Sequence, residues 1–289
     1  MADNPVVILG ARRTPIGAFQ GVFSNAKATD LGAAAVAAAV GDAGVDPARV
    51  DEAIMGCVLP AGLGQAPARQ AALGGGLPVG VSCTTVNKMC GSGMKAIMQA
   101  HDGIAAGSAG TVVAGGLESM TNAPYLLPKA RSGYRMGHQE VLDHMFTDGL
   151  QDVYEGHMMG HFAEKTAEKY GFTRDEQDAF AIESVTRAQT GVANGDFANE
   201  ITPVTFSTRR GDVTVAEDET PGTVSIEKIP TLRAAFRKDG TVTAASSSSI
   251  SDGAAAVVMT TASYAEKEGL EPMARVVGHS SYAHEPAWF

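Results

Sequence analysis

Cysteine is scarce in this chain: three occur, at Cys57, Cys83 and Cys90. An odd number without a C-x-x-C pair, and without histidines at zinc-finger spacing, argues against a disulfide framework and against a structural zinc site. Unpaired thiols are typical of a reducing compartment, so we expect a cytoplasmic protein.

Positive charge is also in short supply, with 22 Lys and Arg against 32 Asp and Glu and a formal net charge of -10. Because nucleic-acid binding needs a basic surface that neutralises phosphates, we expect no nucleic-acid partner.

Long apolar runs are missing as well. The most apolar stretch, LGAAAVAAAV at residues 31–40, falls well short of the ~20 residues that cross a bilayer. The opening MADNPVVILGARRTP lacks the basic start and apolar core of a secretory signal. We therefore expect neither a membrane partner nor export.

Glycine, in contrast, is abundant, at 34 of 289 residues, which favours tight turns and close backbone contacts. Short β-branched runs alternate with Ala-rich helical stretches through the first 120 residues: PVVILGA, DLGAAAVAAAVGDAG, DEAIMGCVL, ARQAAL, VSCTTVN, GMKAIMQAHDGIAAG and TVVAGG. Strand and helix in turn predict βαβ units on a mostly parallel sheet, an α/β fold.

The middle of the chain has a different character. Residues 121–171 are rich in Pro, Gly, Met and His and predict an insertion away from the sheet. Thr173 with Glu176 three residues later is a capping box, and it predicts a helix that ends at Gly195. The segment TPVTFSTRRGDVTVAEDE predicts a hairpin that turns at Arg210, Gly211 and Asp212. After the serine run at residues 246–249, which we interpret as a turn, strand and helix return.

Cys90 stands between a β-branched run and a helix, in TTVNKMCGSGMKAIMQA. Gly91 and Gly93 allow a tight turn that leaves backbone N–H groups open at the helix start, where they can hold an anion. A thiolate, or the oxyanion formed when it attacks a carbonyl, would be stabilised there. The dipole contributes ~0.3 to 1 kcal/mol, too little by itself to ionise a thiol at neutral pH, so a partner base is required. The spacing alone equally permits Cys90 to be a small buried hydrophobe, the interpretation we give to Cys57 and Cys83.

The segment VNKMCGSGMKAI resembles the nucleophile motif of the thiolases, and further matches follow in order along the chain: ILGARRTPIGAFQG, VLPAGLGQAPARQAA, AGGLESMTNAPY, MGHFAEKTAEKYGFTRDEQDAFAIES and GTVTAASSSSISDGAAAVV. The resemblance implies the thiolase fold, an α/β fold of αβαβα layers with a mixed, mostly parallel sheet and an inserted loop domain. We expect the N-terminal core half at residues 1–120 and 249–271, the loop domain at 121–248, and the start of the C-terminal half at 272–289.

For chemistry, the resemblance implies an acyltransferase in which Cys90 takes an acyl group from acyl-CoA and a second acetyl-CoA attacks that thioester. Three segments that supply further catalytic groups in the family, Asn-Glu-Ala-Phe, Gly-His-Pro and Cys-Gly-Gly, do not occur here. We therefore expect a chain that lacks most of the C-terminal half and has impaired turnover alone, and we assign no catalytic role to His279 or His284. The reaction implied is condensation of two acetyl-CoA to acetoacetyl-CoA and its reversal. A degradative 3-ketoacyl-CoA thiolase of fatty-acid oxidation, a β-ketoacyl synthase and a noncatalytic acyl-CoA-binding fragment remain alternatives.

The resemblance also implies a coenzyme A site, with coenzyme A as substrate and product and no tightly bound cofactor. The residues carried over to it are Leu150, Met158 and Met159 in the pantetheine tunnel, Phe236 near the adenine, and Ala244 and Ser248 near the pantetheine amides. Many relatives have His where Met158 stands, and Arg near the coenzyme's phosphates where this chain has Pro221-Gly222. Lys228 or Arg210 is the expected replacement for that positive charge.

Other patterns carry weaker predictions. His157 and His161 in HMMGH are four residues apart but lack the Glu of H-E-x-x-H, so we expect no metal site. Partial glycine patterns without strand and helix context do not predict a dinucleotide site. The family resemblance implies a homodimer or homotetramer, with Lys129, Arg131 and Arg135 in the loop through which tetramers assemble.

Overall fold

The computed structural model describes residues 4–209 and 211–288, and the chain folds as two compact units. Unit 1 comprises residues 1–122, 199–218 and 251–280, and unit 2 comprises residues 123–198, 219–250 and 281–289. Arg210, the alternative to Lys228 for a coenzyme contact, lies outside the described residues.

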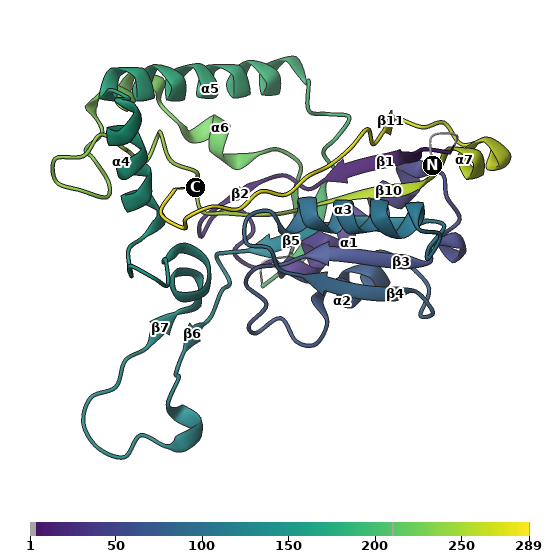
Figure 1. The fold of residues 1–289 in the computed structure, drawn as a ribbon, viewed down its shortest axis with the longest axis horizontal. Helices are drawn as coiled ribbons and strands as arrows, with labels where there is room; N and C mark the ends of the chain where they lie inside the picture. The colour runs from purple at the N-terminus through teal and green to yellow at the C-terminus, as the bar shows by residue number, and fades with distance from the viewer. Residues whose placement is uncertain (1–3, 210, 289) are drawn as a thin grey trace. The chain divides into compact units, whose positions relative to one another are not determined.

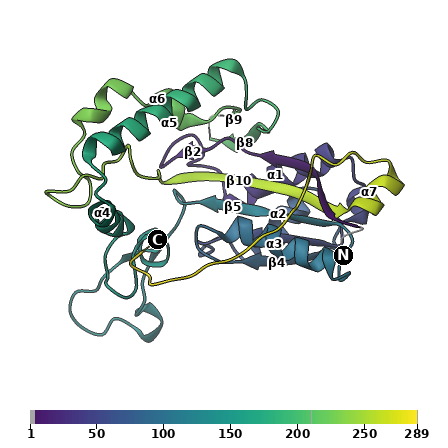
Figure 2. The same cartoon turned by 45° about the horizontal axis from the view of Figure 1, so that its top comes forward.

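Unit 1 is built on one mixed sheet. Its strands are β1 (Val6–Arg13), β2 (Gly17–Ala18), β3 (Glu52–Gly56), β4 (Ser82–Val86), β5 (Val112–Ser119), β10 (Ser251–Thr261) and β11 (Ala274–Arg275). The order is β11-β1-β10-β5-β3-β4, with β2 paired to β10. Figure 2 shows the long β10 running between β1 and β5. Pairings β3–β4 and β3–β5 are parallel, whereas β10 is antiparallel to both its neighbours. The expected α/β fold is confirmed. The expectation that the sheet is mostly parallel is wrong, because β10 pairs in antiparallel direction with both β1 and β5.

Helices cover both faces of this sheet, as Figure 1 shows. They are α1 (Ala28–Ala43), α2 (Pro67–Gly74), α3 (Ser92–Ala105) and the short α7 (Ala262–Glu268), with the 3-10 turn η1 (Pro47–Arg49). One core cluster joins α1 and α2 to Val7, Met55 and Val113, and a second joins α3 to Val6 and Val112. Successive strand residues point to opposite faces, so burial on both sides explains the continuous apolar runs in the sequence.

The predicted hairpin forms from β8 (Val204–Thr208) and β9 (Gly211–Val215), but Gly211 and Asp212, which were expected in the turn, pair with Thr208 and Ser207 in the strands. Its Val204 and Val215 are buried in a third cluster with Phe23 and Leu31, and Phe206 packs against it. The division into family halves and a loop domain stays a prediction. By its contacts, the hairpin belongs to unit 1, as does the segment 272–280. The apolar face of the hairpin is the physical reason, since it is covered by side chains near α1.

The Asp218 carboxylate in unit 1 joins the residues after β9 to the end of β1. Its contacts predict that the stability of the protein falls in acid. Asp218 accepts two hydrogen bonds from the Arg13 guanidinium, at 2.7 and 2.9 Å, and one from the Ile16 amide at 2.8 Å. Burial raises the pKa of Asp218, but the hydrogen bonds from Arg13 and Ile16 outweigh it, so the pKa lies below its ordinary value.

We expect the stabilisation by Asp218 to be fully present above the ordinary carboxyl pKa of about 3.9, and to be lost as pH falls through the lowered folded value. Urea unfolding across this acidic range checks the expectation. Asp218→Asn should lower stability at neutral pH and flatten the acid dependence. An unchanged dependence on pH in that variant would contradict the assignment.

Unit 2 is mainly helical. Its elements are β6 (Tyr125–Leu126), η2 (Ala130–Ser132), β7 (Leu142–Asp143), the π-helical turn η3 (Phe146–Leu150), α4 (Met159–Tyr170), α5 (Arg174–Asn194), α6 (Glu219–Thr223) and η4 (Ile226–Thr231). The predicted capping box is confirmed: Thr173 and Glu176 exchange hydrogen bonds at the start of α5, and Gly195 ends it in the left-handed conformation. Among the described residues, no helix is both long enough and apolar enough to cross a membrane.

Candidate functional site

Cys90 lies in a tight turn between β4 and α3, where its own neighbours fix the backbone. The Asn87 side chain accepts a hydrogen bond from the Met89 amide at 2.9 Å, and Met89 takes a positive φ of 49°. The Ser92 hydroxyl accepts from the Lys88 amide at 2.9 Å and donates to the Met89 carbonyl at 2.6 Å. Cys90 is a free, exposed thiol, so the alternative of a buried hydrophobe is wrong.

The turn leaves donors at the start of α3. Within residues 4–209 and 211–288, the amides of Gly93 and Met94 donate to no group, whereas the Ser92 amide is bonded to Met89 and the Lys95 amide to Gly91. Open N–H groups in a first helical turn favour a negative charge placed near them. This arrangement suits a thiolate or an oxyanion on an acyl group attached to Cys90.

Glycines in the sheet allow this turn to rest directly on the backbone of two strands. A β-carbon built on Gly56, at the end of β3, would lie 2.5 Å from the Ser92 carbonyl carbon and 2.6 Å from the Gly93 nitrogen. One built on Gly116 in β5 would lie 3.3 Å from the Gly93 α-carbon. Sequence reasoning missed this support, although Gly56 and Gly116 at the ends of predicted strands were a usable signal.

The other cysteines have different surroundings. Cys57 is buried, and burial first, then the nearby Glu118 carboxylate, raises the pKa of its thiol to about 12. Cys83 is half-buried, and burial raises the pKa of its thiol too. The prediction that both are packing residues is confirmed.

All seven residues expected to contact coenzyme A fall in unit 2. Their positions are: Leu150 at the end of η3, Met158 and Met159 at the start of α4, Lys228 in η4, and Phe236, Ala244 and Ser248 in the segment before β10. Leu150 and the two methionines are half-buried, and the other four are exposed. Cys90 is in unit 1. That the thiol and these seven residues form one site is therefore a proposal.

Phe236 sits over the first turn of α4. A β-carbon on Gly160 would fall 2.2 Å from the Phe236 ring, so glycine at this position makes room for the aromatic side chain. Met159 is the residue before Gly160, so the Phe236 ring lies against the turn of α4 in which Met159 stands. Phe236 is 41% exposed, which leaves ring surface available for stacking.

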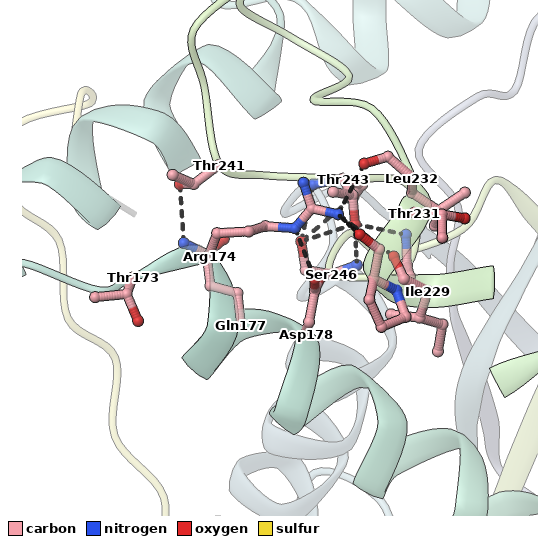
Figure 3. A network of polar contacts seen from close by, with 12 residues as sticks. Thr173, Arg174, Gln177, Asp178, Ile229, Thr231, Leu232, Thr241, Thr243 and Ser246 are labelled. Atoms are coloured by element: carbon pink, nitrogen blue, oxygen red, sulfur yellow. Dashed lines mark hydrogen bonds and ion pairs between the residues drawn. The ribbon is translucent and has the colours of Figure 1, made fainter. Parts of the chain in front are cut away.

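Arg174 and Gln177 on α5 hold the segments that carry Lys228 and Ala244 (Figure 3). Arg174 donates to Asp178 at 2.8 Å and to the Leu232 carbonyl at 2.7 Å, beyond the end of η4. Gln177 donates to the Thr241 hydroxyl at 2.9 Å.

Glu164 on α4 completes this support. Its carboxylate is 1% exposed and accepts hydrogen bonds from the Thr241 amide at 3.0 Å and the Val242 amide at 2.9 Å. The backbone leading to Ala244 and Ser248 is therefore fixed by a buried acid.

Removing this acid is expected to destabilise unit 2. Glu164→Ala leaves two backbone donors without their acceptor, one of them at the buried Val242, and should lower the free energy of unfolding by about 2–4 kcal/mol. Glu183→Ala is the matched control, because Glu183 pairs with Arg187 on the exposed face of α5 and should change stability by no more than ~0.5 kcal/mol. Chemical unfolding measures both. Equal effects of the two substitutions would contradict the role assigned to Glu164.

Unit 2 also has an apolar groove of about 510 Å³ between α4, the start of α5 and the segment before β10. Its lining includes Phe172, Phe180 and Val242, and none of the seven residues expected to contact coenzyme A. The expected coenzyme surface and this groove are therefore different parts of the unit.

Two groups of side chains in the described residues have the composition of metal sites. They are Glu155, His157 and His161 in unit 2, and His101, Asp102 and His279 in unit 1. The sequence drew attention to the first group through its i, i+4 spacing. It gave no signal for the second, because His279 is far from His101 along the chain.

Comparison with known proteins is consistent with this geometry. Residues 6–263 match the family described as "Thiolase, N-terminal domain". An acetyl-CoA acetyltransferase of Pseudomonas aeruginosa is 47% identical over 285 residues, covering 98% of this chain and 72% of that protein. The crystal structure of the Bacillus anthracis acetyl-CoA acetyltransferase superposes with a TM-score of 0.95 at 40% identity, covering 98% of this chain and 72% of that one. A thiolase from Ascaris suum in complex with coenzyme A gives a TM-score of 0.89 at 39% identity, over 95% and 70% of the two chains.

The chain belongs to the thiolase family. The expected thiolase fold is thereby confirmed. The thiolases it resembles are acyltransferases, and those named above carry the name acetyl-CoA acetyltransferase or were crystallised with coenzyme A.

Proposed function

We propose that this chain is an acetyl-CoA acetyltransferase, which condenses two acetyl-CoA to acetoacetyl-CoA and catalyses the reverse thiolysis through an acyl-cysteine at Cys90. The observation that carries the proposal is the exposed Cys90 thiol beside the open amides of Gly93 and Met94. The names of the relatives support the same reaction.

In the first half-reaction, the Cys90 sulfur attacks the carbonyl carbon of acetyl-CoA. The new carbon–sulfur bond forms as the bond to the coenzyme sulfur breaks, and coenzyme A leaves with the proton that Cys90 gave to a base. In the second, the α-carbon of another acetyl-CoA, after losing a proton, attacks the carbonyl carbon of the acetyl-cysteine. The carbon–carbon bond forms as the bond from that carbon to the Cys90 sulfur breaks, and the sulfur takes up a proton and is again a free thiol. Splitting the condensation through a covalent intermediate replaces one difficult step with two easier ones.

Coenzyme A is the substrate and product in this proposal, and unit 2 supplies its contacts. Leu150, Met158 and Met159 offer apolar surface for pantetheine, and Phe236 offers a ring face for adenine. Ala244 and Ser248 lie on the backbone segment fixed by Glu164, and exposed Lys228 offers positive charge to the phosphates. The neighbour crystallised with coenzyme A supports this choice of ligand.

We further propose a cytoplasmic homodimer or homotetramer. Strand β4 is the edge of the unit 1 sheet next to the Cys90 turn, and its outer backbone groups can pair with a second copy. Lys129, Arg131 and Arg135 are in an exposed loop of unit 2 that can serve tetramer assembly.

The test is the acyl group left on Cys90. The chain is incubated with acetyl-CoA or with a long-chain acyl-CoA, quenched in acid and analysed by peptide mass spectrometry. Acetyl on the Cys90 peptide, with little long-chain acyl, is the expected result. Efficient labelling by the long chain favours a degradative 3-ketoacyl-CoA thiolase instead. Binding of coenzyme A without any label on Cys90 overturns the transferase and favours a noncatalytic binder.

A further inference from the structure

Two histidines and an aspartate from distant parts of unit 1 converge on one point. His101 and Asp102 are on α3, and His279 is in the segment that follows β11. The His279 Nε2 atom lies 2.9 Å from Asp102 Oδ1 and 3.2 Å from His101 Nδ1, and His101 Nδ1 lies 3.3 Å from Asp102 Oδ1. We propose that this cluster is a binding site for a divalent transition-metal ion of the zinc class.

The distances match those around a bound ion. Zinc binds imidazole nitrogen and carboxylate oxygen at about 2.0 to 2.2 Å, so ligand atoms at angles between right and tetrahedral lie roughly 2.9 to 3.5 Å apart. All three separations in the cluster fall in this range. The rings of His101 and His279 are also close to perpendicular, at 85° with centroids 5.0 Å apart, so their nitrogens approach from different directions.

Hydrogen bonding alone accounts for the cluster less well. The two imidazole nitrogens can face each other at 3.2 Å only if at least one lacks a proton, and both also face the Asp102 oxygen. Three mutually close atoms thus share a single proton between them. A cation at the centre contacts all three at once, and it requires neutral imidazole and ionised carboxylate, the states that metal ligands adopt.

The second group in the chain provides an internal comparison. Glu155 there pairs with the Lys165 ammonium at 2.7 Å, so an ion must displace an existing partner. The rings of His157 and His161 are stacked, at 28° with centroids 4.1 Å apart. The cluster of His101, Asp102 and His279 has no lysine or arginine partner among the described residues.

The donor set indicates which ion the site prefers. Two imidazoles and one carboxylate, without thiolate, suit zinc and its neighbours nickel and copper rather than calcium or magnesium. The side chains are 24%, 58% and 25% exposed, so water can enter and fill the remaining coordination positions. Binding would fasten the segment at residues 276–280 to α3.

The test uses the full chain with His157→Gln and His161→Gln already introduced, which removes the second group as a competing site. Zinc binding is measured by competition with a chromogenic chelator, and cobalt serves as a probe through its visible absorption. One saturable ion per chain is expected, with absorption of nitrogen-ligated cobalt. His279→Gln and Asp102→Asn should each weaken binding about tenfold or more. Two variants are used because, if one of them fails to fold, the other still tests the site.

His284→Gln is the matched control, because His284 is five residues beyond His279 and outside the cluster. It should bind zinc like the parent. Circular dichroism establishes that each variant is folded. Unchanged zinc binding in folded His279→Gln or Asp102→Asn overturns the proposal, and so does a lack of saturable binding at micromolar zinc in the parent.

Discussion

Replacing Cys90 with alanine is expected to abolish acetyl transfer from acetyl-CoA to the chain while leaving both units folded. The thiol is exposed in a turn held by Asn87 and Ser92, so its removal takes away the nucleophile without disturbing packing. Cys90→Ser keeps the shape but offers a far less acidic hydroxyl, and it should slow acetylation by about 10³-fold or more. The rate of coenzyme A release and the mass of the intact chain measure both effects.

Cys83→Ala is the control for this experiment. Its thiol is half-buried with a raised pKa and lies near the start of β4, seven residues before Cys90 and outside the turn, so the variant should be acetylated at the parent rate. Acetyl label that persists in Cys90→Ala, or disappears in Cys83→Ala, would show that the nucleophile has been misassigned.

A single methyl group at Gly56 is expected to disturb the same turn from the side that packs against β3. The added β-carbon would lie 2.5 Å from the Ser92 carbonyl carbon and 2.6 Å from the Gly93 nitrogen, both backbone atoms that cannot rotate away. The start of α3 must therefore shift. We expect Gly56→Ala to lower the free energy of unfolding by about 3 kcal/mol. A displacement of about 1 Å at Cys90 should also slow acetylation by roughly 10²-fold.

Gly41→Ala separates this effect from the general consequences of replacing glycine. Gly41 is on the exposed face of α1, and a β-carbon there meets no atom within 4 Å. Alanine favours helix over glycine by up to ~1 kcal/mol, so this variant should be slightly more stable and acetylated normally. Urea unfolding and acetylation rates are measured on both variants. If Gly56→Ala matches the parent in both stability and acetylation rate, the start of α3 packs less tightly against β3 than the distances indicate.

Local patterns in the sequence predicted much of the fold. The capping box at Thr173, the end of α5 at Gly195 and the Cys90 turn depend on neighbours a few residues away, and each is confirmed. Apolar runs likewise located the strands, because strands buried on both faces carry apolar residues throughout.

Long-range contacts were not predictable in this way. The entry of β10 between β1 and β5, the burial of Val204 and Val215 near α1, and the approach of His279 to α3 join residues far apart in sequence. Periodicity reports which face of an element is apolar but not which partner covers it. The role of the Glu164 carboxylate was not predictable for the same reason, since its amide partners at Thr241 and Val242 come from a loop without a regular sequence pattern.

The position of β10 has a consequence for synthesis on the ribosome. This strand separates β1 from β5 in the finished sheet, yet it is made after the whole of residues 123–250. A nascent chain that has not reached Ser251 therefore carries β1 without its neighbours β10 and β11, and β5 with one unpaired edge. Both strands are flanked by apolar residues, a state prone to association with other chains. Release from this state awaits the synthesis of β10, which makes termination before Ser251 more hazardous for this protein than a similar loss from a fold assembled in sequence order.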